Sequence, residues 1–238
     1  MAANFSEDEL DSQGQYPEIE AMNEFMEERY SRREEVANSI THGLGIVLGI
    51  VGLVVMAWIA QSSGTAHLLS GCVFGATLIL LYTASTLYHI VRRQPLKSIL
   101  RALDHSAIFL LIAGTYTPFT LIALEGPWGW SLFSVIWGLA CIGLGLQFTL
   151  RKRYPSLQLA LYIAMGWAAI VALGPLLDAL STGGLVLLFA GGVAYTSGVI
   201  FYLWRSLPYS HAVWHLFVLA GSTLHFLAVA LYVLPMRS

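Results

Sequence analysis

Residues 66–91 read AHLLSGCVFGATLILLYTASTLYHIV and contain no aspartate, glutamate, lysine or arginine. About 20 consecutive apolar residues are enough for a helix to cross a bilayer, and this run exceeds that length. Arg92 and Arg93 follow at once, and the next pair, Gln94-Pro95, favours a turn. The stretch therefore predicts a membrane-spanning helix that ends at a cationic loop.

Six further runs of the same kind occupy the rest of the chain beyond residue 35. The breaks between them are short and rich in glycine, proline and polar residues, so neighbouring spans should run antiparallel. We therefore predict an all-α integral membrane protein, a seven-transmembrane helix bundle. Its spans are expected at about Val36–Ala60, Ala66–Val91, Leu100–Leu124, Trp128–Leu150, Leu157–Leu177, Gly184–Trp204 and His211–Leu234.

The charged residues divide the chain into two domains. The 238 residues are 57% apolar and 11% charged, whereas a soluble domain carries about 25% charged residues. Eleven of the 14 acidic residues lie in residues 1–35, which we interpret as an acidic cytoplasmic tail, with 36–238 as the membrane domain. Part of the tail is expected to be disordered, and residues 17–35 have the apolar spacing of an amphipathic helix; a solvated acidic helix is the alternative. No basic groove indicates nucleic-acid binding.

Lysine and arginine predict the orientation. With seven spans, 11 of the 12 basic residues fall on one face of the membrane. Basic residues are enriched in cytoplasmic loops. The N-terminus should therefore be cytoplasmic and the C-terminus should lie on the outer side.

The start of the last span carries a candidate metal-binding pair, His211 and His215. Residues four apart share one helical face, so two imidazoles at this spacing can bind one ion. Polar residues at a membrane boundary are the alternative interpretation. The predicted topology brings His89, at the end of the second span, to the same side, and three histidines with an open fourth position are typical of a catalytic zinc site. Ionisable groups within spans are costly and indicate function.

Two further residues are predicted at the same depth. Asp104 would orient a water on the metal or accept its proton, although an aspartate near a helix start can also be an N-cap. Ser85 precedes His89 by one helical turn and would bond to that water or to a developing oxyanion. Its alternative is a hydroxyl bonded back to its own helix.

The first span contributes Glu35, Asn38 and His42, which share one face. They would support the site, or else form a structural polar cluster at the membrane boundary. Of the remaining histidines, His67 is expected on the opposite side and exposed, and His225 as a hydrogen-bonded core residue. Glycine pairs at positions 45 and 49 and at 71 and 75 favour close helix packing within the bundle.

Taken together, these positions resemble the signature of the hemolysin III family. The matching elements are Glu35-x-x-Asn38-x-x-x-His42, Ser85-x-x-x-His89, Asp104 and His211-x-x-x-His215, and Thr115–Phe119 is similar to the family's third span. This family is the bacterial branch of the progestin and adiponectin receptor proteins, within a superfamily that includes alkaline ceramidases.

The resemblance implies zinc held by His89, His211 and His215, with Ser85 and Asp104 near a water on the metal. It also implies a multi-pass protein of the bacterial inner (plasma) membrane that hydrolyses a lipid amide or ester at the cytoplasmic leaflet. A membrane lipid would then be the substrate or ligand. Two alternatives stay open: a non-enzymatic, receptor-like membrane sensor with structural zinc, and a cytolysin, as the family name suggests.

Overall fold

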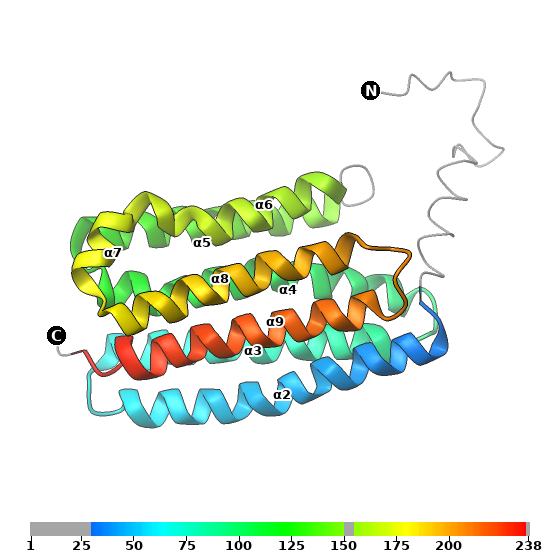
Figure 1. Cartoon of the computed structure of the whole chain (residues 1–238), viewed down its shortest axis with the longest axis horizontal. Coiled ribbons are helices and arrows are strands. Elements are labelled where there is room, and N and C mark those ends of the chain that lie inside the picture. Colours follow the sequence, from blue (N-terminus) through cyan, green and yellow to red (C-terminus); the bar gives the residue numbers. More distant parts are fainter. Residues whose placement is uncertain (1–29, 150–154, 237–238) are drawn as a thin grey trace, which may run out of the picture.

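A computed structural model of the chain describes residues 30–149 and 155–236. Within these residues, seven helical segments are long and apolar enough to cross a membrane, and they lie side by side in alternating directions (Figure 1). The predicted all-α, seven-span bundle is confirmed. The orientation of the termini across the membrane stays a prediction, and the predicted tail lies outside the described residues as far as residue 29.

Three of the spans change their helical geometry along their length, and four are regular α-helices. Each predicted span corresponds to one observed segment, with ends that differ by a few residues. The elements are α2 (Arg32–Ala60), α3 (Thr65–Ile90), α4 (Leu96–Pro118), η2 (Phe119–Ala123), α5 (Gly126–Thr149), α6 (Pro155–Trp167), η3 (Ala168–Ala172), α7 (Leu173–Ala179), α8 (Thr182–Leu203), α9 (Ser210–Ala228) and η4 (Val229–Val233).

Helix α2 begins four residues before the predicted start of its span. Ser31 is the N-cap: its Oγ accepts a hydrogen bond from the Glu34 amide at 3.3 Å, while Glu34 Oε2 accepts one from the Ser31 amide at 2.9 Å. This reciprocal capping box satisfies two amides that the first turn would otherwise leave unpaired. As a result, Glu35 belongs to a rigid first turn of α2.

The two faces of α2 have opposite compositions. Its buried face is mostly small or polar and includes Asn38, His42 and three glycines, whereas most of its large apolar side chains, such as Ile40 and Val54, are exposed. A Cβ on Gly45 would overlap the Tyr82 ring of α3. The glycines therefore let α2 and α3 approach closely, as predicted, and the apolar face is left for lipid.

Pro118 marks a change of helical geometry. Regular α4 ends at this residue and continues as the π-helical segment η2. A proline lacks the amide that would donate to the preceding turn, so it kinks or ends a helix. In the fifth span, Pro175 lies in α7, directly after the 3-10 segment η3.

Helix α4 is the most enclosed span. With η2 it has 78% of its most apolar window buried, against 17% for the spans α6–α7 and α8. It contacts α3, α5 and α6, so residues on its inner faces lie in the interior of the bundle. Asp104 is therefore removed from lipid.

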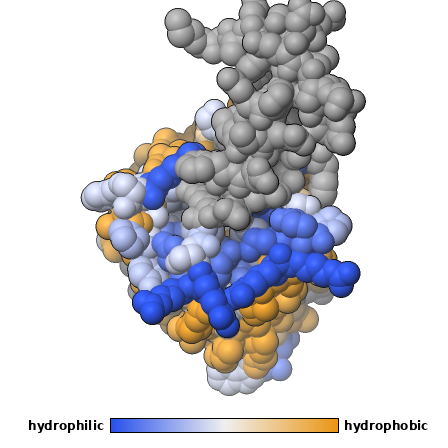
Figure 2. Space-filling model, turned by 90° about the vertical axis from the view of Figure 1, so that its right-hand side faces the viewer, coloured by the Kyte–Doolittle hydropathy of each residue, from blue (hydrophilic) through white to orange (hydrophobic). Residues whose placement is uncertain are grey.

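One end of the bundle collects the hydrophilic residues. We call it the N-terminal end: α2, α4 and α9 begin there, and α3 ends there. Figure 2 shows hydrophilic residues gathered over this end, with apolar residues on the flanks. The described basic residues at this end are Arg32, Arg33, Arg92, Arg93, Lys97, Arg101 and Arg205.

Candidate metal centre

Three histidines meet at the N-terminal end. His89 lies in the last turn of α3, and His211 and His215 lie in the first two turns of α9. Each offers one ring nitrogen such that the three atoms lie within 4.8 Å of one another, and the group could hold a metal ion. His89 and His215 are buried, and His211 is partly exposed.

The hydrogen bonds of His89 select the nitrogen that is free to bind a metal. Its Nδ1 lies 2.5 Å from Oε2 of Glu35. An ionised carboxylate only accepts hydrogen bonds, so Nδ1 donates and Nε2 carries the lone pair of the neutral ring. Nε2 is buried and has no hydrogen-bond partner among the described residues. That nitrogen is therefore available as a ligand.

His215 is oriented by the same logic. Its Nδ1 lies 3.2 Å from the Asn38 carbonyl oxygen and 3.1 Å from Thr41 Oγ1. A carbonyl can only accept, so Nδ1 again donates and Nε2 carries the lone pair. Metal-binding histidines almost always donate their second N–H to a carboxylate or carbonyl in this way. The two buried histidines are thus set in the tautomer that a metal requires.

Helix α2 supplies these supporting contacts. Glu35, Asn38 and His42, predicted either to support the site or to form a separate polar cluster, all touch the histidines. His42 stacks on His215 with ring centroids 3.5 Å apart and an interplanar angle of 14°. Both of its ring nitrogens are buried without a hydrogen-bond partner in the described chain.

Asp104 and Ser85 lie beside the histidines. Asp104 is buried at 8% exposure and interacts electrostatically with Ser85 and His89. The N-cap of α4 is Pro95, so the alternative of Asp104 as an N-cap is wrong. Ser85 Oγ is buried and does not bond back to its own helix; the described group that interacts with it is the Asp104 carboxyl. Both side chains keep hydrogen-bonding capacity for a water or a substrate oxygen.

The sequence reasoning missed three residues that contact this group. Thr41 lies on the inner face of α2, three residues after Asn38, and helical spacing would have indicated it. The Tyr30 ring packs on His211 at 4.8 Å between centroids and on His89 at 5.8 Å. Lys97 was counted only as a topogenic charge, but its Nζ lies 2.6 Å from Glu35 Oε1. No sequence signal distinguishes Lys97 from the neighbouring arginines.

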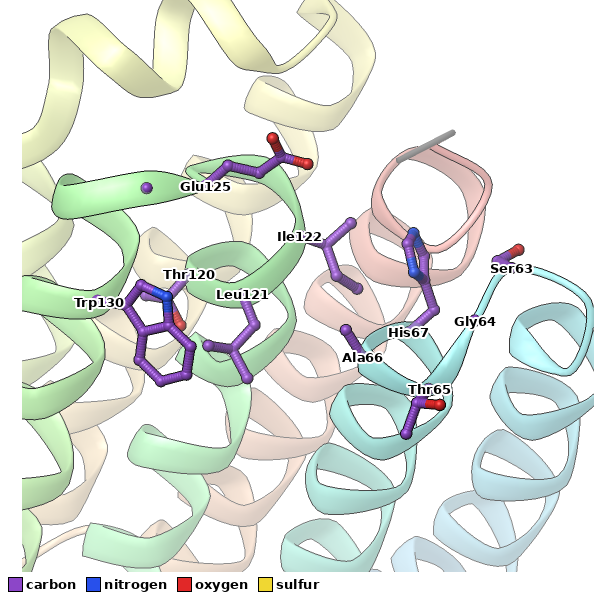
Figure 3. Close-up of a pocket in the computed structure, with 11 residues that line it drawn as sticks. Ser63, Gly64, Thr65, Ala66, His67, Thr120, Leu121, Ile122, Glu125 and Trp130 are labelled. Carbon is purple, nitrogen blue, oxygen red and sulfur yellow. The ribbon is translucent and has the colours of Figure 1, made fainter.

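The opposite end of the bundle has a pocket of about 420 Å³, and the histidine that lines it, His67, makes a structural contact. Figure 3 shows Leu121 and Trp130 on one side of the pocket and Ala66 and His67 on the other. His67 was predicted to be exposed, and this prediction is wrong. It is 4% exposed because Nε2 donates to the Met236 carbonyl, 3.0 Å away, which ties α3 to the end of the last span.

His225 also has a structural contact, as predicted. It is buried, and its Nε2 donates to the Leu188 carbonyl oxygen of α8 at 3.0 Å. The contact joins two neighbouring spans within the membrane domain. It lies ten residues along α9 from His215, too far for the two histidines to share an ion.

The donor set at the N-terminal end fits zinc. Neutral imidazole nitrogens are ligands that Zn²⁺ prefers, and three of them with an open position form a known type of catalytic site. The unpartnered Nε2 of His89 and the tautomers set by Glu35 and by the Asn38 carbonyl oxygen are the features that a metal would use. His89, His211 and His215 would hold the ion.

Fold and site together define a multi-pass α-helical membrane protein with a candidate three-histidine metal centre. The family model described as haemolysin-III related matches residues 30–226, and the chain belongs to this family. The predicted resemblance is thereby confirmed.

Curated relatives agree with this assignment. Hemolysin-3 from Bacillus cereus is 47% identical over 207 residues, covering 87% of this chain and 94% of the relative. A hemolysin-3 homolog from Bacillus subtilis is 44% identical over 204 residues, covering 85% and 96%. The human monocyte to macrophage differentiation factor is 30% identical over 207 residues, covering 84% of each chain.

Proposed function

We propose that the protein is a zinc-dependent hydrolase that cleaves an amide or ester bond of a membrane lipid. The observation that supports the proposal most is the convergence of three histidines within 4.8 Å, beside a buried carboxyl and a buried hydroxyl group. A purely structural metal site needs no such neighbours. A hydrolytic site needs a group that moves protons and a group that stabilises developing charge.

Zinc held by His89, His211 and His215 would polarise the scissile carbonyl and would lower the pKa of water to about 7. Asp104 takes a proton from the attacking water and returns it to the leaving nitrogen or oxygen, so that water adds across the cleaved bond. Ser85 donates its hydroxyl to the developing oxyanion. Glu35 and the Asn38 carbonyl oxygen hold the His89 and His215 rings in position throughout.

The position of the group suits a lipid substrate. The histidines lie at the hydrophilic end of an otherwise apolar bundle, where a lipid's polar linkage would sit while its chains remain in the bilayer. The one-sided basic residues favour the cytoplasmic leaflet. Two Bacillus relatives support the plasma (inner) membrane of a bacterium as its location.

The proposal is tested on protein purified in detergent or reconstituted in liposomes. Bound zinc is quantified by elemental analysis, and fatty-acid release is measured from ceramide-like amides and from lipid esters. The decisive variant is Asp104→Asn, which is nearly isosteric. We expect bound zinc to stay the same and turnover to fall about 10²–10⁴-fold, as when general acid–base catalysis is removed.

The rivals predict other results. A structural metal predicts stoichiometric zinc, no turnover on any lipid, and no effect of Asp104→Asn. A cytolysin, the activity in the name of the B. cereus relative, predicts dye leakage from liposomes at low protein-to-lipid ratios. Failure to retain zinc would remove the basis of both the hydrolase and the structural-metal alternative.

A further inference from the structure

Glu35 is the shared partner of the two ion pairs found among the described residues. Its Oε2 lies 2.5 Å from His89 Nδ1, and its Oε1 lies 2.6 Å from Lys97 Nζ. The side chains of Glu35 and Lys97 are each 13% exposed. One carboxylate therefore joins a candidate metal ligand to an ammonium group, with each oxygen used once.

Lys97 is itself held at this place. Its Nζ lies 3.5 Å from the Tyr88 carbonyl oxygen and 5.0 Å from the centroid of the Tyr88 ring, within cation–π range. Tyr88 is the residue before His89 on α3. By contrast, Arg92 and Arg93, in the loop between α3 and α4, are exposed and form no ion pair with a described residue. Lys97 is thus distinct from its cationic neighbours.

The same contact docks α4. Lys97 lies in the first turn of α4, and Asp104 follows seven residues later, on nearly the same helical face and about 10 Å further along the axis. The Lys97–Glu35 pair joins the first turn of α4 to the first turn of α2. The Lys97 ammonium group therefore influences both the orientation of the His89 ring, through Glu35, and the position of Asp104, through α4.

We propose that Lys97 is a positioning residue of the metal centre: it fixes the Glu35 carboxylate, which in turn fixes the His89 ring. The role rests on the proposed metal binding. Without Lys97, a largely desolvated carboxylate loses its counter-charge and can turn toward solvent. His89 then loses its fixed acceptor, and part of the preorganisation for a metal is lost.

The test is the zinc affinity of the purified full-length protein, measured by competition with a chromophoric chelator. Removing a residue that directly contacts a metal ligand costs about 10–100-fold in affinity, so Lys97→Met, one contact further out, should cost about 3–10-fold. Lys97→Arg should restore most of the affinity, because it keeps the charge and the reach. Arg92→Met, which removes a nearby charge in the loop between α3 and α4, is the matched control and should leave the zinc affinity unchanged.

A double-mutant cycle decides whether Lys97 acts through Glu35. In the Glu35→Gln background, Lys97→Met should weaken zinc binding by less than about twofold, since the intermediary is already lost. Lys97→Gln replaces Lys97→Met if the latter is not monodisperse by size-exclusion chromatography.

Three results would overturn the role of Lys97. They are unchanged affinity in Lys97→Met, equal losses in Lys97→Met and Arg92→Met, and a full effect in the Glu35→Gln background. If Lys97→Met leaves the affinity unchanged and the wild type binds zinc tightly, the role of Lys97 is overturned but the proposed function is not. Absence of zinc binding by the wild type overturns both.

Discussion

His89 and His67 lie at opposite ends of the same helix, α3, and both are buried, at 2% and 4% exposure. The two histidines differ in the group that accepts their hydrogen bond and in the surroundings of the other ring nitrogen. His67 Nε2 donates to the Met236 carbonyl oxygen, and none of the described residues that line its pocket is another histidine. His89 gives Nδ1 to a carboxylate and keeps Nε2 for a space shared with two other histidines.

The comparison teaches that burial alone does not identify a functional histidine in a membrane helix. Both residues are costly to bury, and each makes a hydrogen bond through one ring nitrogen. What separates them is the acceptor and the remaining nitrogen. A histidine that donates to a carboxylate and faces other imidazoles, as His89 does, is a candidate metal ligand. A histidine whose contact is a single backbone carbonyl, as for His67, has a structural role in holding two segments together.

The largest effect is expected from removing a ligand. His215→Ala deletes one of three imidazoles and also frees the Asn38 carbonyl oxygen. We expect zinc affinity to fall by more than the roughly 100-fold upper limit for residues that only support a ligand. Chelator competition measures it. If the variant binds zinc as tightly as the wild type does, the cluster of His89, His211 and His215 is not a metal site.

Much of the fold could be predicted, because its determinants are local. Seven apolar runs and their basic loops specify spans and one-sidedness without knowledge of packing. Topology alone predicts that His89, His211 and His215 share one end of the bundle, because α3 ends where α9 begins; their convergence within 4.8 Å comes from the packing. Asp104 needs no more than the same argument.

What the sequence did not indicate depends on contacts between distant helices. Lys97 is one of several cations around the connection between α3 and α4, and only the meeting of the first turns of α2 and α4 pairs it with Glu35. The contact of His67 depends on where the chain runs after the last span, at Met236, 169 residues away. The π segment after Pro118 reflects how the freed backbone groups are satisfied, which proline alone does not determine.

A smaller effect is expected from the carboxylate that orients His89. Glu35→Gln keeps the size of the side chain but loses its charge and one strong acceptor. Zinc affinity should fall about 10–100-fold, with the metal still bound at high concentration. The measurement is the same chelator competition. A loss as large as that of His215→Ala would mean that Glu35 is a ligand, and no loss would make the His89 contact equivalent to the carbonyl contact of His67.

A still smaller effect is expected from the histidine that stacks on His215. His42→Phe keeps an aromatic ring at 3.5 Å stacking distance but removes two buried nitrogens that lack a hydrogen-bond partner among the described residues. Zinc affinity should change by less than about threefold, and thermal stability in detergent should hold or rise, since unsatisfied buried polar atoms cost about 1–3 kcal/mol each. A tenfold weaker affinity would instead place His42 among the groups that contact the metal or its water.

The smallest effect on zinc is expected at the other end of α3. His67→Ala removes the hydrogen bond to the Met236 carbonyl and leaves that acceptor to water or to nothing. Zinc affinity should equal that of the wild type, because α3 separates the two ends by more than six helical turns. Stability should fall by about 0.5–1.5 kcal/mol, the net contribution of a typical hydrogen bond, which a thermal unfolding assay in detergent would detect. His67→Gln, which can still donate, should recover part of that loss. If His67→Ala remains folded but binds zinc more weakly, the two ends of the bundle are coupled through α3. His67 would then not have a purely structural role.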